Sequence, residues 1–163
     1  MKRFLFCLCY AAALGVVSFI FGRLFPKKLL HPDAFPWRTH PWEQKLFDAL
    51  QIRRWQAKVP DMSRIFTKIM PAKKITCDTL HDLPQMIRET CVAELTHALL
   101  SLSGLALLWI WPGAGGIFLT VIYILFGNLP FLLIQRYNRP RLQKLLAMQQ
   151  ARAKRKETLS CAH

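Results

Sequence analysis

Acidic residues are scarce in this sequence, and so are the short motifs that mark common enzyme chemistry. Only nine Asp and Glu stand against 23 Lys and Arg in 163 residues, which leaves a formal net charge of +14. The sequence contains no G-x-S-x-G nucleophile elbow and no glycine-rich phosphate loop of the G-x-x-x-x-G-K or G-x-G-x-x-G type. No His is followed five residues later by Asp, so the H-x4-D pattern of soluble-face glycerolipid acyltransferases is absent too. These absences exclude the motif-defined forms of those enzyme classes.

The cysteines form no pattern that predicts disulfides or a metal. There are five, an odd number, and none lies in a C-x-x-C pair or beside His at ligand spacing. Glu94 and His97 have the E-x-x-H spacing of a carboxylate-bridged metal site, but the second copy that such a site requires is missing. We therefore expect free thiols, no metal and no other cofactor.

The sequence is rich in apolar residues that lie beside positive charge. Hydrophobic residues make up 53% of the chain, although the net charge is strongly positive. This combination is typical of a small bacterial inner-membrane protein with basic surfaces. Nucleic acid is the other common partner of such a charge. We rank anionic lipid headgroups or a phosphorylated donor above it, because the charges cluster next to apolar stretches. The prediction is a cell-membrane protein with no nucleic-acid partner.

Three apolar stretches are long enough to be membrane helices. Residues 1–22 hold an uncharged run after a basic start, a second run ends the helix expected over 84–111, and residues 117–134 form an uncharged run of 18. About 20 helical residues cross the ~30 Å hydrocarbon core of a bilayer. A cleaved signal peptide is the alternative for the first stretch. We favour an uncleaved anchor, because no small-residue cleavage site follows the run.

Residues 23–83 are expected to remain outside the hydrocarbon, at its surface. Prolines in the stretch 31–42 predict an extended connector, because the residue before a proline disfavours helix. An amphipathic helix is expected over 42–58, with one face of Trp42, Leu46, Leu50 and Arg53 and another of Glu43, Lys45 and Asp48. A second amphipathic piece is expected over 63–70, after a stop at Pro60-Asp61. Because sixty residues make a marginal subdomain alone, we expect these faces to pack on the membrane or on the spanning helices.

The remaining residues are expected to form a helical hairpin over 84–141 and a basic tail over 142–163. Asp82 is the expected N-cap, Pro84 lies just inside the first helix, and Trp111 precedes its stop. The glycine-rich stretch that follows makes the turn, and the tail continues as a surface helix. The predicted fold class is an all-α membrane protein with about three apolar helices and interfacial amphipathic helices.

The distribution of positive charge predicts an orientation. Residues 110–116 contain no Lys or Arg, whereas residues 23–93 contain thirteen and residues 136–163 contain eight. The positive-inside rule then places the middle segment and the tail in the cytoplasm and the turn outside. A crossing first segment puts the N-terminus outside, in mild conflict with Lys2 and Arg3. A shallow or re-entrant first segment removes the conflict.

Polar groups are expected to converge where the hairpin meets the cytoplasmic boundary. Glu94 and His97 are three residues apart and share one helix face. The returning helix brings several polar residues to a similar depth, namely Gln135, Arg136, Asn138, Arg139 and Arg141. Ionisable groups near the membrane interior favour a functional interpretation. Singly, Glu94 and His97 are also explained as a cap where the helix meets water, and the arginines as a positive-inside anchor.

A polar notch interrupts the last apolar run. Asn128 brings an amide into a region where unpaired polar groups are costly, and Pro130 lacks the N–H that a helix interior uses. An interhelical hydrogen bond and a ligand contact are equally good explanations of Asn128.

At these residues the chain resembles the glycosyl-4,4′-diaponeurosporenoate acyltransferase family, membrane enzymes of staphyloxanthin-type carotenoid biosynthesis. The likeness is closest at Asn128, Pro130 and the block QRYNRPRL at 135–142. It covers most of residues 50–150 and also includes Glu89-Thr90, Ala93-Glu94-Leu95, His97 and, more weakly, Trp55, Lys58 and Asp61. Met62 departs from the glycine that usually follows the aspartate, and residues 1–45 match only in hydrophobicity.

The resemblance implies transfer of a fatty acyl group to a sugar hydroxyl, the glucose C6 position, of a glycosylated C30 carotenoid. Our hypothesis makes His97, held by Glu94, the general base. Binding of the anionic part of the acyl donor, or of the developing oxyanion, is assigned to Arg136, Asn138, Arg139 and Arg141, with Gln135 beside them. Asn128 and Pro130 would shape the slot for the polyene or the acyl tail.

Two other interpretations stay open. The first is a membrane scaffold that holds lipid or pigment enzymes together without chemistry. The second is the same acyl transfer to a different glycolipid, because a family resemblance does not fix the acceptor. The form of the acyl donor is also open.

Overall fold

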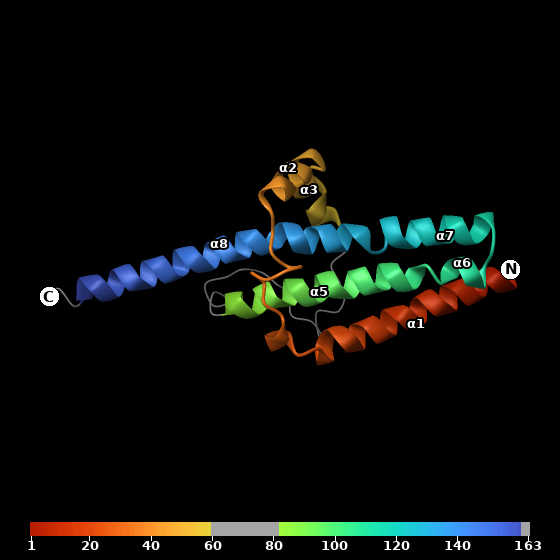
Figure 1. Ribbon diagram of the computed structural model, residues 1–163, viewed down its shortest axis with the longest axis horizontal. Helices are drawn as coiled ribbons and strands as arrows, with labels where there is room; N and C mark the ends of the chain where they lie inside the picture. The colour runs from red at the N-terminus through yellow and green to blue at the C-terminus, as the bar shows by residue number, and fades with distance from the viewer. Residues whose placement is uncertain (60–81, 161–163) are drawn as a thin grey trace.

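The computed structural model describes residues 1–59 and 82–160, and all of their regular structure is helical. Three long helical rods lie side by side (Figure 1). These are α1 (Lys2–Leu24), α5 (Leu83–Gly104) continued by α6 (Leu107–Ile110), and α7 (Ala114–Leu125) continued by α8 (Leu129–Ser160). Each rod contains a stretch long and apolar enough to cross a membrane. The predicted fold class, an all-α membrane protein with three apolar helices, is confirmed.

The rods run antiparallel in sequence order, so the N-terminus lies beside the α6–α7 turn (Figure 1). We call this the turn end of the bundle, and the opposite end, which holds Arg136 and Arg139, the arginine end. At the turn end Phe4 packs edge-on against Trp111, with ring centroids 6.2 Å apart. Further along, the Tyr10 hydroxyl donates to the Ser103 carbonyl at 3.0 Å. The first apolar stretch is therefore packed as part of the bundle.

Glycine permits the close approach of helices at the turn end. A Cβ on Gly116 would lie 1.8 Å from the Trp111 carbonyl oxygen, and one on Gly104 would lie 2.6 Å from the Tyr123 ring. The Trp111 carbonyl belongs to the backbone, so rotating a side chain cannot relieve the first clash. The predicted glycine-rich turn thus has a steric reason, which is the close passage of α7 over α6.

Both helical rods of the hairpin are interrupted. The first helix, predicted as continuous over 84–111, stops at Gly104 and resumes at Leu107. The predicted notch in the second is confirmed, because α7 ends at Leu125 and α8 begins at Leu129 with Pro130 in its first turn. Asp82 occupies the N-cap position of α5 as predicted, although its side chain forms no capping hydrogen bond.

The predicted amphipathic helix over 42–58 is wrong in extent, and Glu43, expected on its polar face, is buried. It is divided into α2 (Pro41–Ala49), α3 (Ile52–Trp55) and a 3-10 turn, η2 (Gln56–Lys58), because Gln51 adopts a left-handed conformation with φ of 51°. Glu43 and Phe47 form the face that is buried in the protein, whereas Trp42 and Leu46 are exposed and do not pack on the spanning helices. Packing of these two residues on the membrane stays a prediction. Glu43 faces inward because it forms an ion pair with Arg136, described below. The predicted piece over 63–70 and the Pro60-Asp61 stop lie outside the described residues.

Side-chain packing is concentrated at the arginine end. Three buried clusters lie there, around Trp37 and Cys91, around Phe47 and Tyr137, and around Ile87 and Leu142. A second 3-10 turn, η1 (Lys27–Leu29), joins α1 to this end through an ion pair of 2.7 Å between Lys27 and Glu89. The apolar side chains nearer the turn end are mostly exposed, as expected for surfaces that face lipid.

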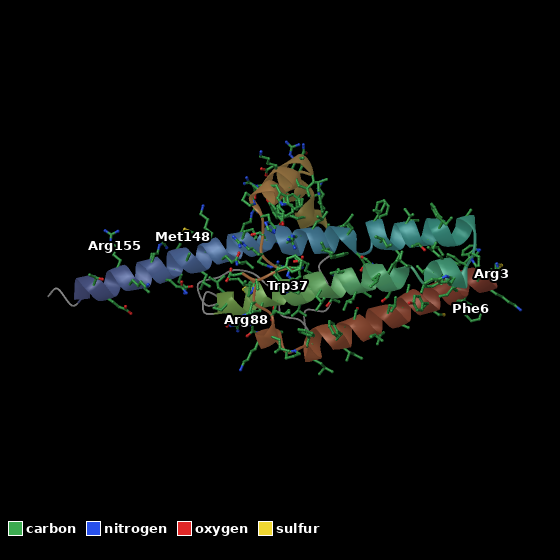
Figure 2. The ribbon with its side chains drawn as sticks, in the orientation of Figure 1. Arg3, Phe6, Trp37, Arg88, Met148 and Arg155 are labelled. Carbon is green, nitrogen blue, oxygen red and sulfur yellow. The ribbon has the colours of Figure 1, made fainter. Side chains whose placement is uncertain are left out.

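The helix α8 is longer than the bundle. Its second half extends past the ends of α1 and α5 (Figure 1), and Met148 and Arg155 lie on this free part (Figure 2). The basic tail predicted as a surface helix is therefore a direct continuation of the third rod, through Pro140 and as far as Ser160.

Candidate active site

The candidate site lies between α5 and α8, which form the most extensive helix pair of the structure. The two helices are antiparallel, so contacts proceed in step along them. His97 stacks on Phe131 with centroids 5.0 Å apart, Glu94 binds Arg136 and Arg139, and Ile87 packs with Leu142. The predicted convergence of Glu94 with arginines of the returning helix is thus present in the structure.

The Glu94 carboxylate bridges two guanidinium groups. Its Oε1 accepts a hydrogen bond of 2.6 Å from Arg136 Nη1, and its Oε2 accepts one from Arg139 Nη2. The side chain is 9% exposed, so these bonds replace most of its hydration. Charge-assisted hydrogen bonds of this kind are about twice as strong as neutral ones, so Glu94 fastens α8 to α5 at two points.

Arg136 uses all five of its N–H groups within the protein. Its Nε and Nη2 form a bidentate pair with Glu43, at 2.9 and 2.8 Å. Nη1 and Nη2 also donate to the Pro36 and Arg38 carbonyl oxygens, each at 3.2 Å, in addition to the bond to Glu94. Arg136 therefore connects α8 to α2, to α5 and to the connector that precedes α2. A guanidinium presents five donors and no more, so none is left for a ligand.

Arg139 is completely buried. Its Nε donates to the Thr90 hydroxyl at 2.9 Å, its Nη1 to the Trp37 carbonyl at 2.6 Å, and its Nη2 to Glu94. The guanidinium carbon also lies 5.8 Å from the centre of the Trp37 ring. Figure 2 shows Trp37 between the ribbons of α5 and α8, which is how the connector reaches this site.

Together, Glu43, Glu94, Arg136 and Arg139 form a charge network with two anions and two cations. Burial acts to raise the pKa of the Glu43 carboxyl, but its hydrogen bonds and charge interaction with Arg136 outweigh burial and hold that pKa below its ordinary value. The pairing explains why α2 turns this residue inward. An unpaired buried charge costs several kcal/mol, on the order of 3–5 when one partner is removed, so each member of the network depends on the others.

His97 lies closer to the turn end than this network, and its partner is Asn128. Its Nδ1 is 3.1 Å from Asn128 Oδ1, while Asn128 Nδ2 donates to the Tyr123 carbonyl at 3.0 Å. Because the amide nitrogen is committed to a carbonyl, the amide oxygen faces the ring, and Nδ1 must be the protonated nitrogen. No hydrogen bond joins Glu94 to His97 within the described ranges. The expectation that Glu94 holds the imidazole is therefore wrong, and Asn128 does so.

The other predicted residues differ in their surroundings. Gln135 and Asn138 are half-buried on α8, and neither side chain hydrogen-bonds to any residue that the structure describes. Arg141 is exposed, and its guanidinium lies over the Tyr137 ring at 3.8 Å. The predicted group of arginines is thus split, with two guanidinium groups enclosed by the protein and one left open.

Sequence reasoning gave no site role to Glu43, Thr90, Trp37 and Tyr137, although the family likeness includes Thr90 and Tyr137. Glu43 and Arg136 are 93 positions apart, and nothing in local periodicity indicates that they pair. Among the described residues, no group of three or more His, Cys, Asp or Glu side chains is placed to hold a metal ion.

The geometry can be compared with known proteins. The family model described as glycosyl-4,4′-diaponeurosporenoate acyltransferase matches residues 26–148, which include every residue of the charge network and the His97–Asn128 pair. The chain belongs to this family. It is an acyltransferase by that membership.

Curated members of the glycosyl-4,4′-diaponeurosporenoate acyltransferase family share modest identity with the chain. The protein of that name from Staphylococcus aureus (strain MRSA252) is 25% identical over 159 residues, which cover 95% of this chain and 94% of the relative. The one from Staphylococcus haemolyticus (strain JCSC1435) is 30% identical over 117 residues, 70% of this chain and 67% of the relative. The one from S. aureus (strain N315) is 26% identical over 136 residues, 82% and 78% respectively. No solved structure is significantly similar.

Proposed function

We propose that this acyltransferase esterifies a sugar hydroxyl of a glycosylated C30 carotenoid with a fatty acyl chain, and that His97 is the general base. The relatives' names supply the acceptor class. The positioned imidazole, with Nδ1 held by Asn128 and Nε2 left without a described partner, is the observation that supports the chemistry. A membrane protein with three apolar helices is suited to two substrates that are both lipids. The positive-inside rule supports a cytoplasmic arginine end.

The reaction needs a base because a sugar hydroxyl is a weak nucleophile. In the proposed step the hydroxyl oxygen attacks the carbonyl carbon of the acyl donor while its proton passes to His97 Nε2. The tetrahedral intermediate then collapses with cleavage of the bond to the leaving group, which takes the proton back from Nε2. The products are the acyl ester and the protonated leaving group, and the imidazole returns to its starting form.

Phe131 and the polar residues beyond it supply the rest of the proposed site. Phe131 stacks on the imidazole with an interplanar angle of 11° and fixes the plane of the ring. Gln135 lies one helical turn beyond Phe131 and so on the same face of α8, with Asn138 one turn further. Their amide N–H groups have no described partner, so we assign them to the oxyanion that develops at the carbonyl. The charge network, in this proposal, holds α8 in register with α5.

Replacing His97 by Ala tests the base. We expect the acyl ester to fall by about 10²–10⁴-fold, the usual contribution of a general base. The measurement is mass spectrometry of lipid extracts from cells that make the glycosylated carotenoid, with expression of the variant checked by immunoblot. His31→Ala is the matched control, because His31 is an exposed histidine of the connector. A His97→Ala protein that accumulates normally and acylates at the wild-type rate would refute the assignment.

The same extracts identify the acceptor. If the ester appears on another glycolipid and not on the carotenoid glycoside, the chemistry stands and the acceptor is wrong. If no acylated lipid depends on the gene, the acyl transfer itself is wrong for this chain.

A further inference from the structure

A basic cleft lies where the α2–α3 elbow meets α8 and has no role in the proposed acyl-transfer step. Its volume is about 280 Å³, and its charged lining is Asp48, Arg53, Arg54 and Arg141. Ligand sites that enclose drug-sized molecules occupy roughly 300–1,000 Å³, so this cleft has the size for a head group and not for a whole lipid. Figure 1 shows the elbow standing against the side of α8 that the bundle leaves open.

The fold builds this cleft by turning the chain sharply at Gln51. The left-handed conformation of this residue ends α2 and starts α3 in a new direction, so Ile52 enters the buried cluster with Phe47 and Tyr137. The two arginines that follow Ile52 then line the cleft across from Arg141. The apolar cluster beneath them fixes the distance between the two walls.

Arg141 is held in place by an aromatic ring, and its N–H donors stay available to an anion. Its guanidinium rests over the Tyr137 ring, and Tyr137 is in turn held edge-on by Phe47, with centroids 5.6 Å apart. A guanidinium stacked on a ring keeps its N–H groups at its edges, where they can bind an anion. Neither Arg141 nor Arg53 forms a hydrogen bond with any other described side chain or carbonyl, and Arg54 donates one, of 2.9 Å, to Gln51.

The charge balance of the cleft favours an anion. Three arginines face one carboxylate, Asp48, which already accepts a hydrogen bond of 3.0 Å from Gln44. Planar guanidinium groups bind phosphate oxygens in pairs, and charge-assisted bonds of this kind are about twice as strong as neutral ones. The structure therefore offers several unused donors around one small volume.

The position of the cleft indicates what carries the anion. Trp42, Leu46 and Leu50 recur every four residues along the outer edge of the same elbow, and all three are exposed. An exposed stripe of Trp and Leu beside arginines is typical of a helix at the boundary between headgroups and acyl chains. An anion that binds here is therefore attached to an apolar chain that continues into the membrane.

We propose that this cleft binds the phosphate of the acyl donor. The inference rests on the proposed acyl transfer, because it assigns the donor a phosphorylated head group. Two acyl donors share this chemistry, a phospholipid and the acyl thioester of a phosphorylated carrier such as coenzyme A. Arg53, Arg54 and Arg141 are its binding residues.

Binding, and not turnover, tests this proposal, so that its failure can be told from failure of the His97 assignment. The full-length protein in dodecyl maltoside, which contains no phosphate, is titrated with coenzyme A and separately with dihexanoyl phosphatidylglycerol. Dihexanoylglycerol is the phosphate-free control. Calorimetry measures the affinity for coenzyme A, and native mass spectrometry measures binding of the two dihexanoyl lipids. Preference for coenzyme A indicates a soluble carrier, and preference for the phospholipid indicates a lipid donor.

Two triple variants with the same loss of charge are compared. The cleft variant carries Arg53→Gln, Arg54→Gln and Arg141→Gln, and the control carries Arg152→Gln, Lys154→Gln and Arg155→Gln on the free part of α8. We expect the cleft variant to weaken phosphate binding by at least about 10-fold, since it removes several charge-assisted bonds, and the control by less than about 2-fold. If the cleft variant unfolds, Arg53→Gln with Arg54→Gln alone serves, because this pair leaves the Tyr137 contact intact.

The outcomes are distinct. Equal weakening in both triple variants would mean a nonspecific charge effect and would overturn the cleft. Wild-type protein that binds neither phosphate probe better than dihexanoylglycerol would overturn it as well. Normal phosphate binding in His97→Ala, together with normal acylation, would remove the proposed base and leave the cleft standing.

Discussion

Arg139 has no exposed surface and bonds Thr90, Trp37 and Glu94, whereas Arg141, two residues later on α8, is exposed with its guanidinium on Tyr137. The two residues have the same chemistry and nearly the same depth. They differ because a helix turns about 200° over two residues, which sends one side chain toward α5 and the other toward the α2–α3 elbow. A cluster of arginines in a sequence can therefore contain both buried groups that hold helices together and exposed groups whose N–H donors remain open to a ligand. The contacts of each arginine, and not its spacing in the sequence, distinguish the two kinds.

The largest expected effect comes from Arg139→Met, which keeps most of the side-chain volume and removes the charge. Glu94 then retains only Arg136, and the Trp37 carbonyl and Thr90 hydroxyl lose their donor. We expect the free energy of unfolding to fall by about 3–5 kcal/mol, the usual cost of breaking a buried ion pair. Chemical unfolding in mixed micelles, followed by circular dichroism, measures it. A loss below 1 kcal/mol would show that the network does not hold the fold.

A smaller effect, with a dependence on pH, is expected at Glu43. Its pKa in the folded protein lies below the ordinary value, so its pairing with Arg136 stabilises the fold at neutral pH and is lost as the pH falls through the lowered pKa. We expect Glu43→Gln to cost about 1–3 kcal/mol at pH 7, as for a buried hydrogen bond to a charged group.

The pH profile separates this cost from a simple packing defect. The wild-type protein should lose stability below the ordinary carboxyl value of 4.5, and Glu43→Gln should lose less over the same range. Parallel stability curves for the two proteins, measured by thermal unfolding between pH 3 and 7, would contradict the pairing.

The smallest expected effect on stability is that of Arg141→Gln. An exposed guanidinium on an aromatic ring contributes about 0.5–1 kcal/mol, so the unfolding midpoint should move little. The same measurement on Arg139→Met and Arg141→Gln makes the comparison direct. A large loss of stability in Arg141→Gln would mean that Arg141 holds the fold together, as Arg139 does, and is not a free group of the cleft.

The spans and the meeting of Glu94 with arginines of α8 could be predicted because both follow from length along a helix. Uncharged runs fix where a rod enters and leaves the hydrocarbon, and two antiparallel rods joined by a short turn bring residues at equal distances from that turn together. Asn128 is also recognisable as unusual from the sequence alone. Its polar side chain lies in an apolar run, and a partner has to be found for it.

The inward face of α2 could not be predicted, because hydrophobic periodicity assumes that charge points outward. Here Glu43 points inward to reach Arg136, and Trp42 points outward. The partner of His97 was also out of reach. The shared helix face of Glu94 and His97 favours Glu94 from the sequence, whereas the geometry of the α7–α8 break brings the Asn128 amide within 3.1 Å of the ring.

That break also sets how deep the imidazole lies. The 12-residue α7 rises about 18 Å from the turn end, against a hydrocarbon thickness of ~30 Å. With the third rod spanning a bilayer, a ring beside the first residues of α8 lies within the depth of the hydrocarbon core and away from bulk solvent. Water is the commonest competitor of an alcohol for an activated acyl group, and a site that excludes it suppresses hydrolysis of the donor. For the proposed acyl transfer at His97, the break between α7 and α8 therefore favours transfer to the sugar over hydrolysis of the donor.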